Sequence, residues 1–454
     1  MEPERADTFE LVGAAVAGHA RELDVRHRSG RVAYPEQRHR DKNPHVAVTH
    51  EVHGLVVTDH EFSVPLDHAL PDGDRIGVFA REVAAEDGRD RPFLVFLQGG
   101  PGMESPRPTS AKTPTWLRRA LKDYRLLLLD QRGTGRSTPI GSLPGMTPEQ
   151  QAAHLELHRA DSIVRDAERI RQELGVDTWS VLGQSFGGFC VCTYLSIAPE
   201  GLREAYVTGG LPPIARPTDD VYRATYERVR ERNRRFYARY PEDLERVRAL
   251  HARLAEDELH LPSGDRLTSR RFRQLGSMLG MNEGPERLHY LLDFPPDSPA
   301  FGHGVESETS FARNPLYAIV HESCYADGCA TRWSAERLLP DEFASTPELF
   351  TGEMVYSWMF EDYRALAPLR EAAELLAAHD WPPLYDGERL ESNEVPAAAA
   401  VYAEDMYVER VFSEETAARI KGLRMWLTNE YQHDGLRQDE RVLARLVDLV
   451  RGRV

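Results

Sequence analysis

Lysine and cysteine are scarce in this sequence, and long apolar runs are missing. Only four of the 56 basic residues are lysines, which leaves few candidates for lysine chemistry. The four cysteines are spaced neither as metal ligands nor as a disulfide framework, so we interpret them as reduced core residues. No stretch reaches the ~18 apolar residues of a membrane span, and the acidic N-terminus does not resemble a signal peptide. These features predict a cytoplasmic protein with no membrane partner, no metal and no cofactor.

The charge balance argues against nucleic acid as a partner. The 454 residues include 73 acidic and 56 basic side chains, a formal net charge of −17. Arginines cluster at 228–235, but acidic residues are interspersed, so we interpret this segment as a solvated helix face. Hydrophobic residues make up 41% of the chain, which excludes a disordered or fibrous protein. The sequence does not indicate the oligomeric state.

The hydrophobic pattern predicts an α/β fold with a mostly parallel sheet and a helical insertion. Residues 53–83 resemble a β-hairpin around a turn at 71–74. Short apolar runs, typical of buried parallel strands, follow at 93–97, 126–129, 179–182, 205–207, 396–402 and 423–428. Helical spacing is plain at 161–174 and again from 222 to 240. We predict a polar extension (1–48), a core in two parts (49–214 and 363–454), and a helical insertion (215–362) between those parts.

The strongest motif is Gly183-Gln184-Ser185-Phe186-Gly187, between the apolar run at 179–182 and an apolar stretch of helical character. A G-x-S-x-G motif at a strand-to-helix turn exposes a strained serine whose oxygen can act as a nucleophile. The flanking glycines let helix and strand approach where side chains would clash. The motif therefore predicts that Ser185 is a catalytic nucleophile.

Two further glycine-containing segments follow predicted strands. The segment Gln98-Gly99-Gly100-Pro101-Gly102 can turn a main-chain N–H toward a substrate carbonyl oxygen. Together with the N–H of Phe186, Gly99 and Gly100 are predicted to form an oxyanion hole. The segment DQRGTGRS at 130–137 does not complete G-x-G-x-x-G, and no G-K-[ST] occurs, so a nucleotide site is not indicated.

In this order and spacing, QGGPG, DQRGTGRS and GQSFGG resemble the prolyl iminopeptidase (proline iminopeptidase) family of α/β-hydrolase serine peptidases. That family typically shows HGGPG, DQRGxGxS and GxSxGG, so Gln98 stands where the family has histidine. The main-chain donors of the loop should survive this change, although loop anchoring and substrate fit depend on it. The resemblance implies an α/β-hydrolase fold with an inserted cap, and release of N-terminal proline from peptides.

A nucleophilic serine needs a general base that a carboxylate orients, and in this fold the chain order is serine, acid, histidine. His433 follows the last predicted strand, where the fold presents its base; the other histidines after Ser185 lie in the insertion or in a helix before the late strands. Asp405 and Glu404 both follow the run at 396–402, and Asp434 is a third candidate. The resemblance favours Asp405, because aspartate is the usual acid of the family.

In the resembled family the insertion forms a cap that closes over the active site, and its carboxylates bind the free N-terminal amine of a peptide. A cationic amine in a closed pocket needs a paired negative charge. Glu322 and Glu353 are the candidates, although each could instead form an ordinary ion pair. Both lie among aromatic residues that could line a proline ring: Tyr317, Tyr325, Tyr356, Trp358 and Phe360.

The sequence leaves other functions open. The core motifs specify acyl transfer but not the acyl group, so an esterase or an aminopeptidase of another preference would fit them. A non-catalytic binding protein of this fold would usually lack a triad member, whereas all three positions are filled here. Dehalogenases and epoxide hydrolases are disfavoured, because they use aspartate where this chain has Ser185.

Overall fold

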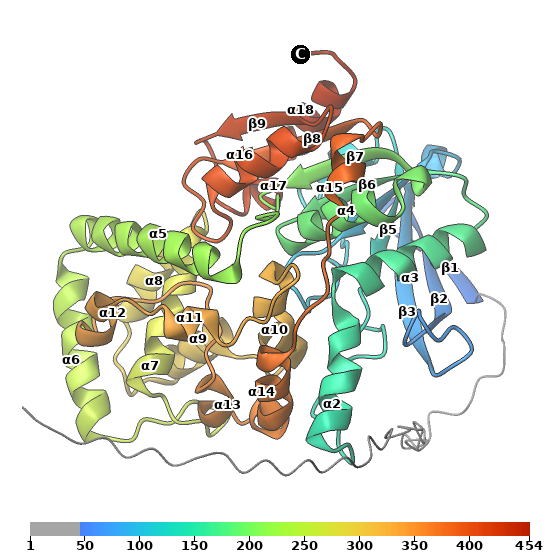
Figure 1. Cartoon of the computed structure of the whole chain (residues 1–454). Helices are drawn as coiled ribbons and strands as arrows, with labels where there is room; N and C mark the ends of the chain where they lie inside the picture. The colour runs from blue at the N-terminus through green and yellow to red at the C-terminus, as the bar shows by residue number, and fades with distance from the viewer. Residues whose placement is uncertain (1–45) are drawn as a thin grey trace, which may run out of the picture. The chain divides into compact units, whose positions relative to one another are not determined.

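The computed structural model describes residues 46–454 (Figure 1). The predicted extension, 1–48, lies outside the described residues except for its end, where the first strand begins. A nine-stranded sheet has the order β1-β2-β3-β5-β4-β6-β7-β8-β9. Its strands are β1 (Val46–Val52), β2 (Leu55–Pro65), β3 (Arg75–Ala85), β4 (Phe93–Leu97), β5 (Arg125–Leu129), β6 (Trp179–Gln184), β7 (Leu202–Thr208), β8 (Ala397–Tyr402) and β9 (Arg424–Thr428).

The sheet has an antiparallel part and a parallel part. Strands β1, β2 and β3 pair antiparallel, and β3 also pairs antiparallel with β5. The β2–β3 pairing confirms the predicted hairpin. From β5 to β9 all pairings are parallel. The strands β4 to β8 coincide with the predicted apolar runs to within a few residues. Strand β1 was not predicted, because its sequence, VAVTHEV, has neither a continuous apolar run nor regular alternation, and its residues are largely exposed.

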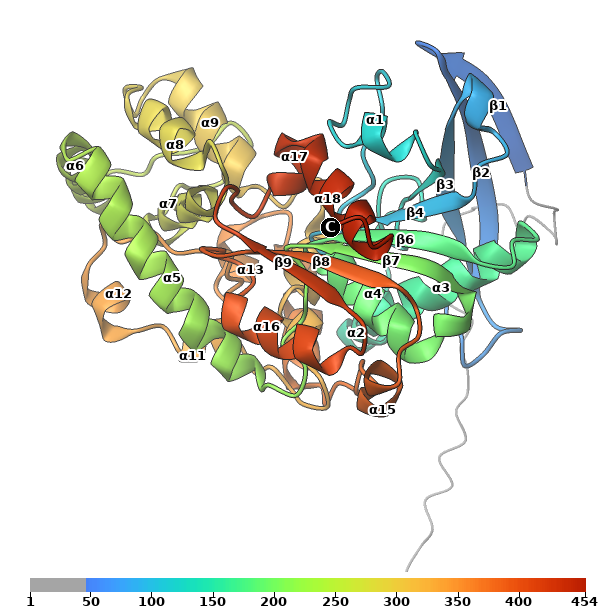
Figure 2. The same cartoon turned by 90° about the horizontal axis from the view of Figure 1, so that it is seen from above.

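Helices cover both faces of the sheet (Figure 2). The helices of the described chain are α1 (Leu117–Ala120), α2 (Pro148–Leu155), α3 (Ala160–Glu173), α4 (Phe186–Ile197), α5 (Thr218–Arg239), α6 (Glu242–Glu256), α7 (Ser269–Phe272), α8 (Gly284–Leu292), α9 (Pro299–Thr309), α10 (Pro315–Val320), α11 (Ser334–Arg337), α12 (Asp341–Ser345), α13 (Met359–Asp362), α14 (Arg370–Ala378), α15 (Gly387–Glu391), α16 (Arg410–Arg419), α17 (Gly435–Gln438) and α18 (Glu440–Val450).

Alternate residues of the buried strands point into two separate cores. In β4, Phe93, Val95 and Leu97 pack on the side of α3 and α4, whereas Leu94 and Phe96 pack on the side of α1 and α18. Burial on both faces is why these strands are continuously apolar. Cys190, Cys192 and Cys324 are buried in the first core, and all four cysteines are free, as predicted.

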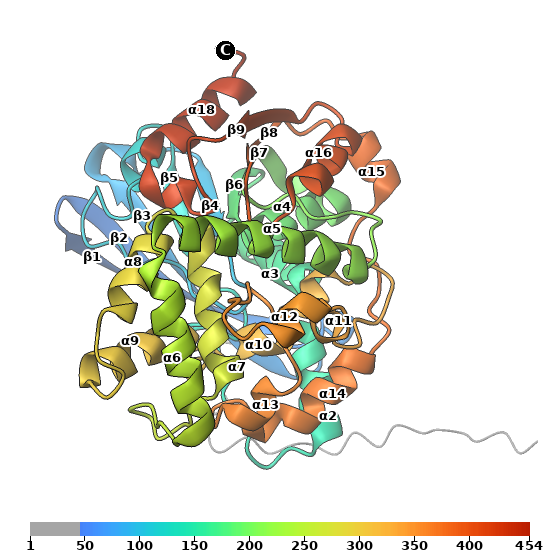
Figure 3. The same ribbon diagram turned by 90° about the vertical axis from the view of Figure 1, so that its left-hand side faces the viewer.

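Helices α5 to α13 follow one another between β7 and β8 and gather beside the sheet (Figure 1). We call residues 215–362 the cap segment; its boundaries stay a prediction. The long helix α5 runs along the border between the other cap helices and the segment that contains β8, α16 and β9 (Figure 3). Among the described residues, no helix combines the length and the apolar character that crossing a membrane requires.

Candidate active site

Ser185 lies at a tight turn between β6 and α4. Its backbone has φ 55° and ψ −127°, a conformation that costs energy for a residue with a side chain. A Cβ atom on Gly187 would lie 1.9 Å from the Leu97 carbonyl oxygen, and one on Gly183 would lie 2.2 Å from the Gly187 carbonyl oxygen. The prediction that glycines flank the serine because side chains would clash is confirmed.

The loops after β8 and β9 bring two further predicted residues to Ser185. His433 Nε2 lies 2.9 Å from Ser185 Oγ, and His433 Nδ1 lies 2.7 Å from Asp405 Oδ2. The other oxygen of Asp405, Oδ1, accepts hydrogen bonds from the main-chain N–H groups of Tyr407 (2.8 Å) and Val408 (3.1 Å). Because an ionised carboxylate only accepts, Nδ1 carries the proton and Nε2 presents a lone pair to the serine.

The two competing carboxylates bind other groups. Glu404 pairs with the guanidinium of Arg235 at the protein surface. Asp434 Oδ1 accepts the main-chain N–H of Asn282 at 3.0 Å, and its Oδ2 accepts from Gln438 Nε2 at 2.7 Å. Of the three candidates, Asp405 is the one whose carboxylate hydrogen-bonds to His433.

The environment of His433 tunes its basicity. The ring is almost fully buried, and burial by itself would lower the pKa of His433. The charge of Asp405, its hydrogen bond, and the charge of Glu353 act in the opposite direction and raise the pKa above the ordinary histidine value. The charge of Glu353 is thus one of the causes that raise the pKa of His433.

The glycine-rich loop lies directly against the serine. A Cβ atom on Gly99 would lie 2.8 Å from the Gln184 carbonyl oxygen and 2.9 Å from Ser185 Cβ. Phe186 is the first residue of α4, where main-chain N–H groups have no acceptor within the helix. Gly100, which follows Gly99 in the loop, has a φ of 131°. The loop and the start of α4 thus both border Ser185.

The segment 130–137 supports this loop. Gln131 Nε2 donates to the Gln98 carbonyl oxygen at 3.0 Å, an anchor that uses the main chain and does not require histidine at position 98. Arg132 Nε donates to Asp166 Oδ2 at 2.7 Å, and both side chains are almost fully buried. The carboxylate of Asp130 accepts the main-chain N–H groups of Ser105 and Arg136. Through these contacts, the segment 130–137 supports the loops beside Ser185.

Glu353 and Glu322 occupy different surroundings in the cap segment. Glu353 Oε1 accepts from the Tyr317 hydroxyl, and its Oε2 lies 3.6 Å from His321 Nε2. Glu322 is buried, which raises the pKa of Glu322, and its Oε1 accepts the main-chain N–H of Ala335 at 2.8 Å. Glu353 is the one whose charge acts on His433.

The five predicted aromatic residues also divide. Tyr317 and Tyr325 both contact the ring of His321, with centroid separations of 5.2 Å and 5.9 Å, and Tyr325 contacts Phe189 of α4. The main-chain nitrogen of Tyr317 would lie 2.6 Å from a Cβ atom on Gly102, so α10 packs on the glycine-rich loop. The other three pack on aromatic neighbours within the cap segment: Tyr356, Trp358 and Phe360.

Two residues near the triad were not predicted from the sequence. The ring of Tyr407 lies 4.6 Å from that of His433, and its hydroxyl donates to the Ser277 carbonyl oxygen in the cap segment. Its position two residues after Asp405 was the available signal. Arg232 donates to the loops of both Asp405 and His433. The interpretation of residues 228–235 as a solvated helix face therefore holds for Arg234, which is exposed and pairs with Glu231 on its own helix, but is wrong for Arg232.

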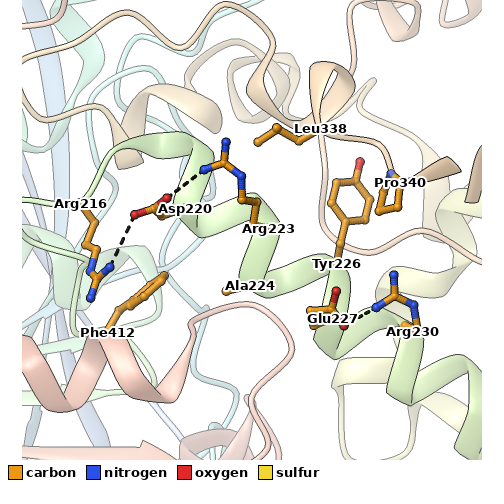
Figure 4. Close-up of a pocket in the computed structure, with 10 residues that line it drawn as sticks. All are labelled: Arg216, Asp220, Arg223, Ala224, Tyr226, Glu227, Arg230, Leu338, Pro340 and Phe412. Atoms are coloured by element: carbon orange, nitrogen blue, oxygen red, sulfur yellow. Dashed lines mark hydrogen bonds and ion pairs between the residues drawn. The ribbon is translucent and has the colours of Figure 1, made fainter. Parts of the chain in front are cut away.

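A surface groove of about 580 Å³ along α5 includes none of the predicted site residues (Figure 4). Its charged side chains neutralise one another in pairs, such as Arg216 with Asp220 and Arg230 with Glu227. The groove is lined by Arg216, Asp220, Arg223, Ala224, Tyr226, Glu227, Arg230, Leu338, Pro340 and Phe412. Within residues 46–454, no group of three or more His, Cys, Asp or Glu side chains is arranged to hold a metal ion.

The fold and the sequence define the class of protein. Residues 92–312 match the family described as the alpha/beta hydrolase fold. The sheet agrees with that match, because the strands from β5 to β9 are parallel and the loops after β6, β8 and β9 carry Ser185, Asp405 and His433. The chain is an α/β hydrolase, and the predicted fold class is confirmed.

Two relatives identify the family within this class. The proline iminopeptidase of Aeromonas sobria is 48% identical over 415 residues, which span 88% of this chain and 97% of that protein. The proline iminopeptidase aneH of Aspergillus aculeatus is 36% identical over 412 residues, which span 84% of this chain and 90% of that protein. The chain belongs to the proline iminopeptidase family, which confirms the predicted resemblance.

Proposed function

We propose that this protein is a serine aminopeptidase that releases N-terminal proline from peptides through an acyl-enzyme. Ser185 is the nucleophile, His433 the general base and Asp405 the carboxylate that orients the base. The observation that carries the proposal is the continuous hydrogen-bonded chain from Ser185 Oγ to His433 (2.9 Å) and on to Asp405 (2.7 Å), in a member of this family.

In the first half-reaction, Ser185 Oγ attacks the carbonyl carbon of the N-terminal residue while its proton moves to His433 Nε2. The tetrahedral intermediate then expels the amine of the next residue, which takes that proton from His433 as the C–N bond breaks. In the second half-reaction, water attacks the ester, and His433 again takes and returns one proton. The products are free proline and the shortened peptide.

Charge develops on the substrate carbonyl oxygen during both steps. Main-chain N–H groups that already point at this oxygen stabilise the transition state without reorganisation. The N–H of Phe186 at the start of α4 and an N–H of the Gly99–Gly100 segment border Ser185 on two sides. We assign the oxyanion hole to these groups.

Glu353 and Glu322 are proposed to bind the cationic amine of the substrate. Glu353 is the stronger candidate, because its charge reaches His433 and because Tyr317, its hydroxyl donor, lies on the helix that packs against the glycine-rich loop. The Glu353 carboxylate would neutralise the positive charge of the substrate ammonium, which a buried cation requires. This pairing would restrict the enzyme to substrates with a free N-terminus.

The test is release of arylamine from a prolyl arylamide, with Ser185→Ala as the matched variant. We expect turnover by the wild type and a loss of about 10³-fold or more in kcat for the variant. Equal activity of the two proteins would remove Ser185 from the mechanism. A panel of other aminoacyl arylamides, N-acetylprolyl arylamide and simple esters measures how strictly the enzyme requires proline and a free amine.

Two alternatives use the same residues. An aminopeptidase with another first-residue preference would turn over a different arylamide best, and an esterase would not distinguish free from acetylated amines. A non-catalytic binding protein would fail to react with a serine-directed fluorophosphonate.

We propose a cytoplasmic location because all four cysteines are free.

A further inference from the structure

Helix α5 of the cap segment carries three arginines on one face. Arg228, Arg232 and Arg235 are spaced by four and three residues, which aligns their side chains along the helix. Arg228 binds the Glu409 carboxylate through two contacts of 2.7 Å, and Arg235 Nη2 donates to Glu404 Oε1 at 3.1 Å. Both carboxylates belong to the loop after β8 that carries Asp405. Ion pairs therefore hold this face of α5 to the loop. Figure 3 shows α5 running beside the segment that contains β8, α16 and β9.

Arg232, in the middle of this face, contacts two catalytic loops at once. Its Nη2 atom donates to the main-chain carbonyl oxygen of Glu404 and to the side-chain oxygen Oε1 of Gln432. Glu404 immediately precedes Asp405, and Gln432 immediately precedes His433. One nitrogen atom of the cap segment thus bridges the residue before the acid and the residue before the base.

We propose that Arg232 is a positioning residue, which holds the loops of Asp405 and His433 in the register that the triad needs. This inference rests on the function proposed above. The acid and the base come from separate loops after β8 and β9, and their hydrogen bond requires both loops to keep the same relative position. A misplacement of about 1 Å at a catalytic group can lower the rate by about 100-fold.

The same contact makes triad geometry depend on the cap segment. Asn282, also in the cap segment, donates its main-chain N–H to Asp434, the residue after His433. The base loop is thus held from the cap on both sides of the histidine. Docking of the cap segment is then coupled to alignment of the triad. If the cap segment is displaced from these loops, His433 is no longer held in line with Ser185 and Asp405.

The variant Arg232→Met removes both hydrogen bonds and keeps an apolar side chain on the helix. We expect kcat on a prolyl arylamide, expressed per active site, to fall by about 10- to 100-fold with KM changed less than about 2-fold. Arg234→Met is the matched control, because Arg234 is exposed on the same helix and pairs with Glu231. Active sites are counted by stoichiometric fluorophosphonate labelling of Ser185, so a fraction of misfolded protein does not enter kcat.

Arg232→Lys provides a rescue that a purely structural role would not predict. Both hydrogen bonds come from the single atom Nη2, so one lysine ammonium can restore them. If Arg232 acted instead through the two-pronged geometry of its guanidinium, lysine could not replace it. We expect the lysine variant to recover most of the lost kcat. Gln432→Ala, which removes one acceptor and leaves the arginine in place, is expected to lower kcat in the same direction and provides a second test if Arg232→Met does not fold.

The rate of fluorophosphonate labelling separates this inference from the function proposed above. Labelling needs the nucleophile and its base but no peptide substrate, so it tests Arg232 even if prolyl substrates are not turned over by the wild type. Slower labelling of Arg232→Met than of Arg234→Met supports the positioning role. Equal labelling rates and equal kcat per active site in these two variants, or a lysine variant no better than the methionine variant, would overturn it.

Discussion

Replacing Asp405 by asparagine is expected to remove most catalysis and leave the fold intact. Asp405 Oδ1 accepts two main-chain N–H groups, from Tyr407 and Val408, so an oxygen must occupy that position. The asparagine amide would keep its oxygen there and turn its NH₂ group toward His433 Nδ1. Nδ1 must then accept, Nε2 carries the proton, and the ring cannot take a proton from Ser185. A wrong tautomer of this kind lowers kcat by about 10⁴-fold in serine proteases, or about 5 kcal/mol of activation free energy.

Steady-state kinetics on a prolyl arylamide measure this loss, and thermal unfolding checks that the variant is folded. Glu404→Gln is the matched control, because Glu404 neighbours Asp405 but pairs with Arg235 at the surface, and such pairs contribute about 1 kcal/mol or less. We expect its kcat to stay within about 2-fold of wild type. The reasoning is refuted if Asp405→Asn retains more than about a tenth of wild-type kcat, or if Glu404→Gln loses as much activity as Asp405→Asn.

Three further predictions concern the cap, the turn and the buried scaffold. Glu353→Gln should move the acid limb of the kcat/KM–pH profile to lower pH. Loss of this negative charge destabilises the imidazolium and so lowers the pKa of His433. The same variant should raise KM for free-amine substrates about 10- to 100-fold. An unmoved limb would contradict this placement of Glu353. Gly187→Ala should fail to fold, because the added methyl group would lie 1.9 Å from a carbonyl oxygen of β4. Gly141→Ala is the control and should fold normally, because the space around Gly141 is open. Circular dichroism compares the two variants, and equal stability would contradict the predicted clash. Arg132→Met should lower the free energy of unfolding by about 3–5 kcal/mol, because it leaves the buried carboxylate of Asp166 without its guanidinium partner. Urea unfolding measures this change. A loss below about 1 kcal/mol would be too small for a buried ion pair and would contradict the prediction.

Much of the sheet was predictable because its strands are buried on both faces. The runs at 93–97 and 179–182 are apolar without alternation, and they form β4 and β6. Strand β1 escaped prediction because an exposed edge strand needs no such run. Short cap helices such as α7 and α11 also escaped it. A helix of four residues has little stability of its own and depends on contacts with the rest of the fold.

The loops that carry the site were predictable for a topological reason. The carboxyl ends of parallel strands meet at one edge of a sheet, so residues that follow β6, β8 and β9 converge although 248 positions separate Ser185 from His433. The choice among Asp405, Glu404 and Asp434 was different. All three lie near the ends of these strands in sequence, and only the direction of each side chain in the folded loop decides which one reaches the histidine.

The sequence by itself predicted the parts of the candidate site: a serine at a strand-to-helix turn, a glycine-rich loop, and a carboxylate and a histidine after late strands. These features are local, because each depends on a motif and on the strand before it. Tertiary structure alone decided that Asp405 is the carboxylate that hydrogen-bonds to His433, that Glu353 binds the Tyr317 hydroxyl, and that Arg232 donates to both Glu404 and Gln432 while Arg234 faces solvent. Such contacts depend on how the cap segment docks on the sheet, and side chains far apart in the chain acquire their partners only through that docking.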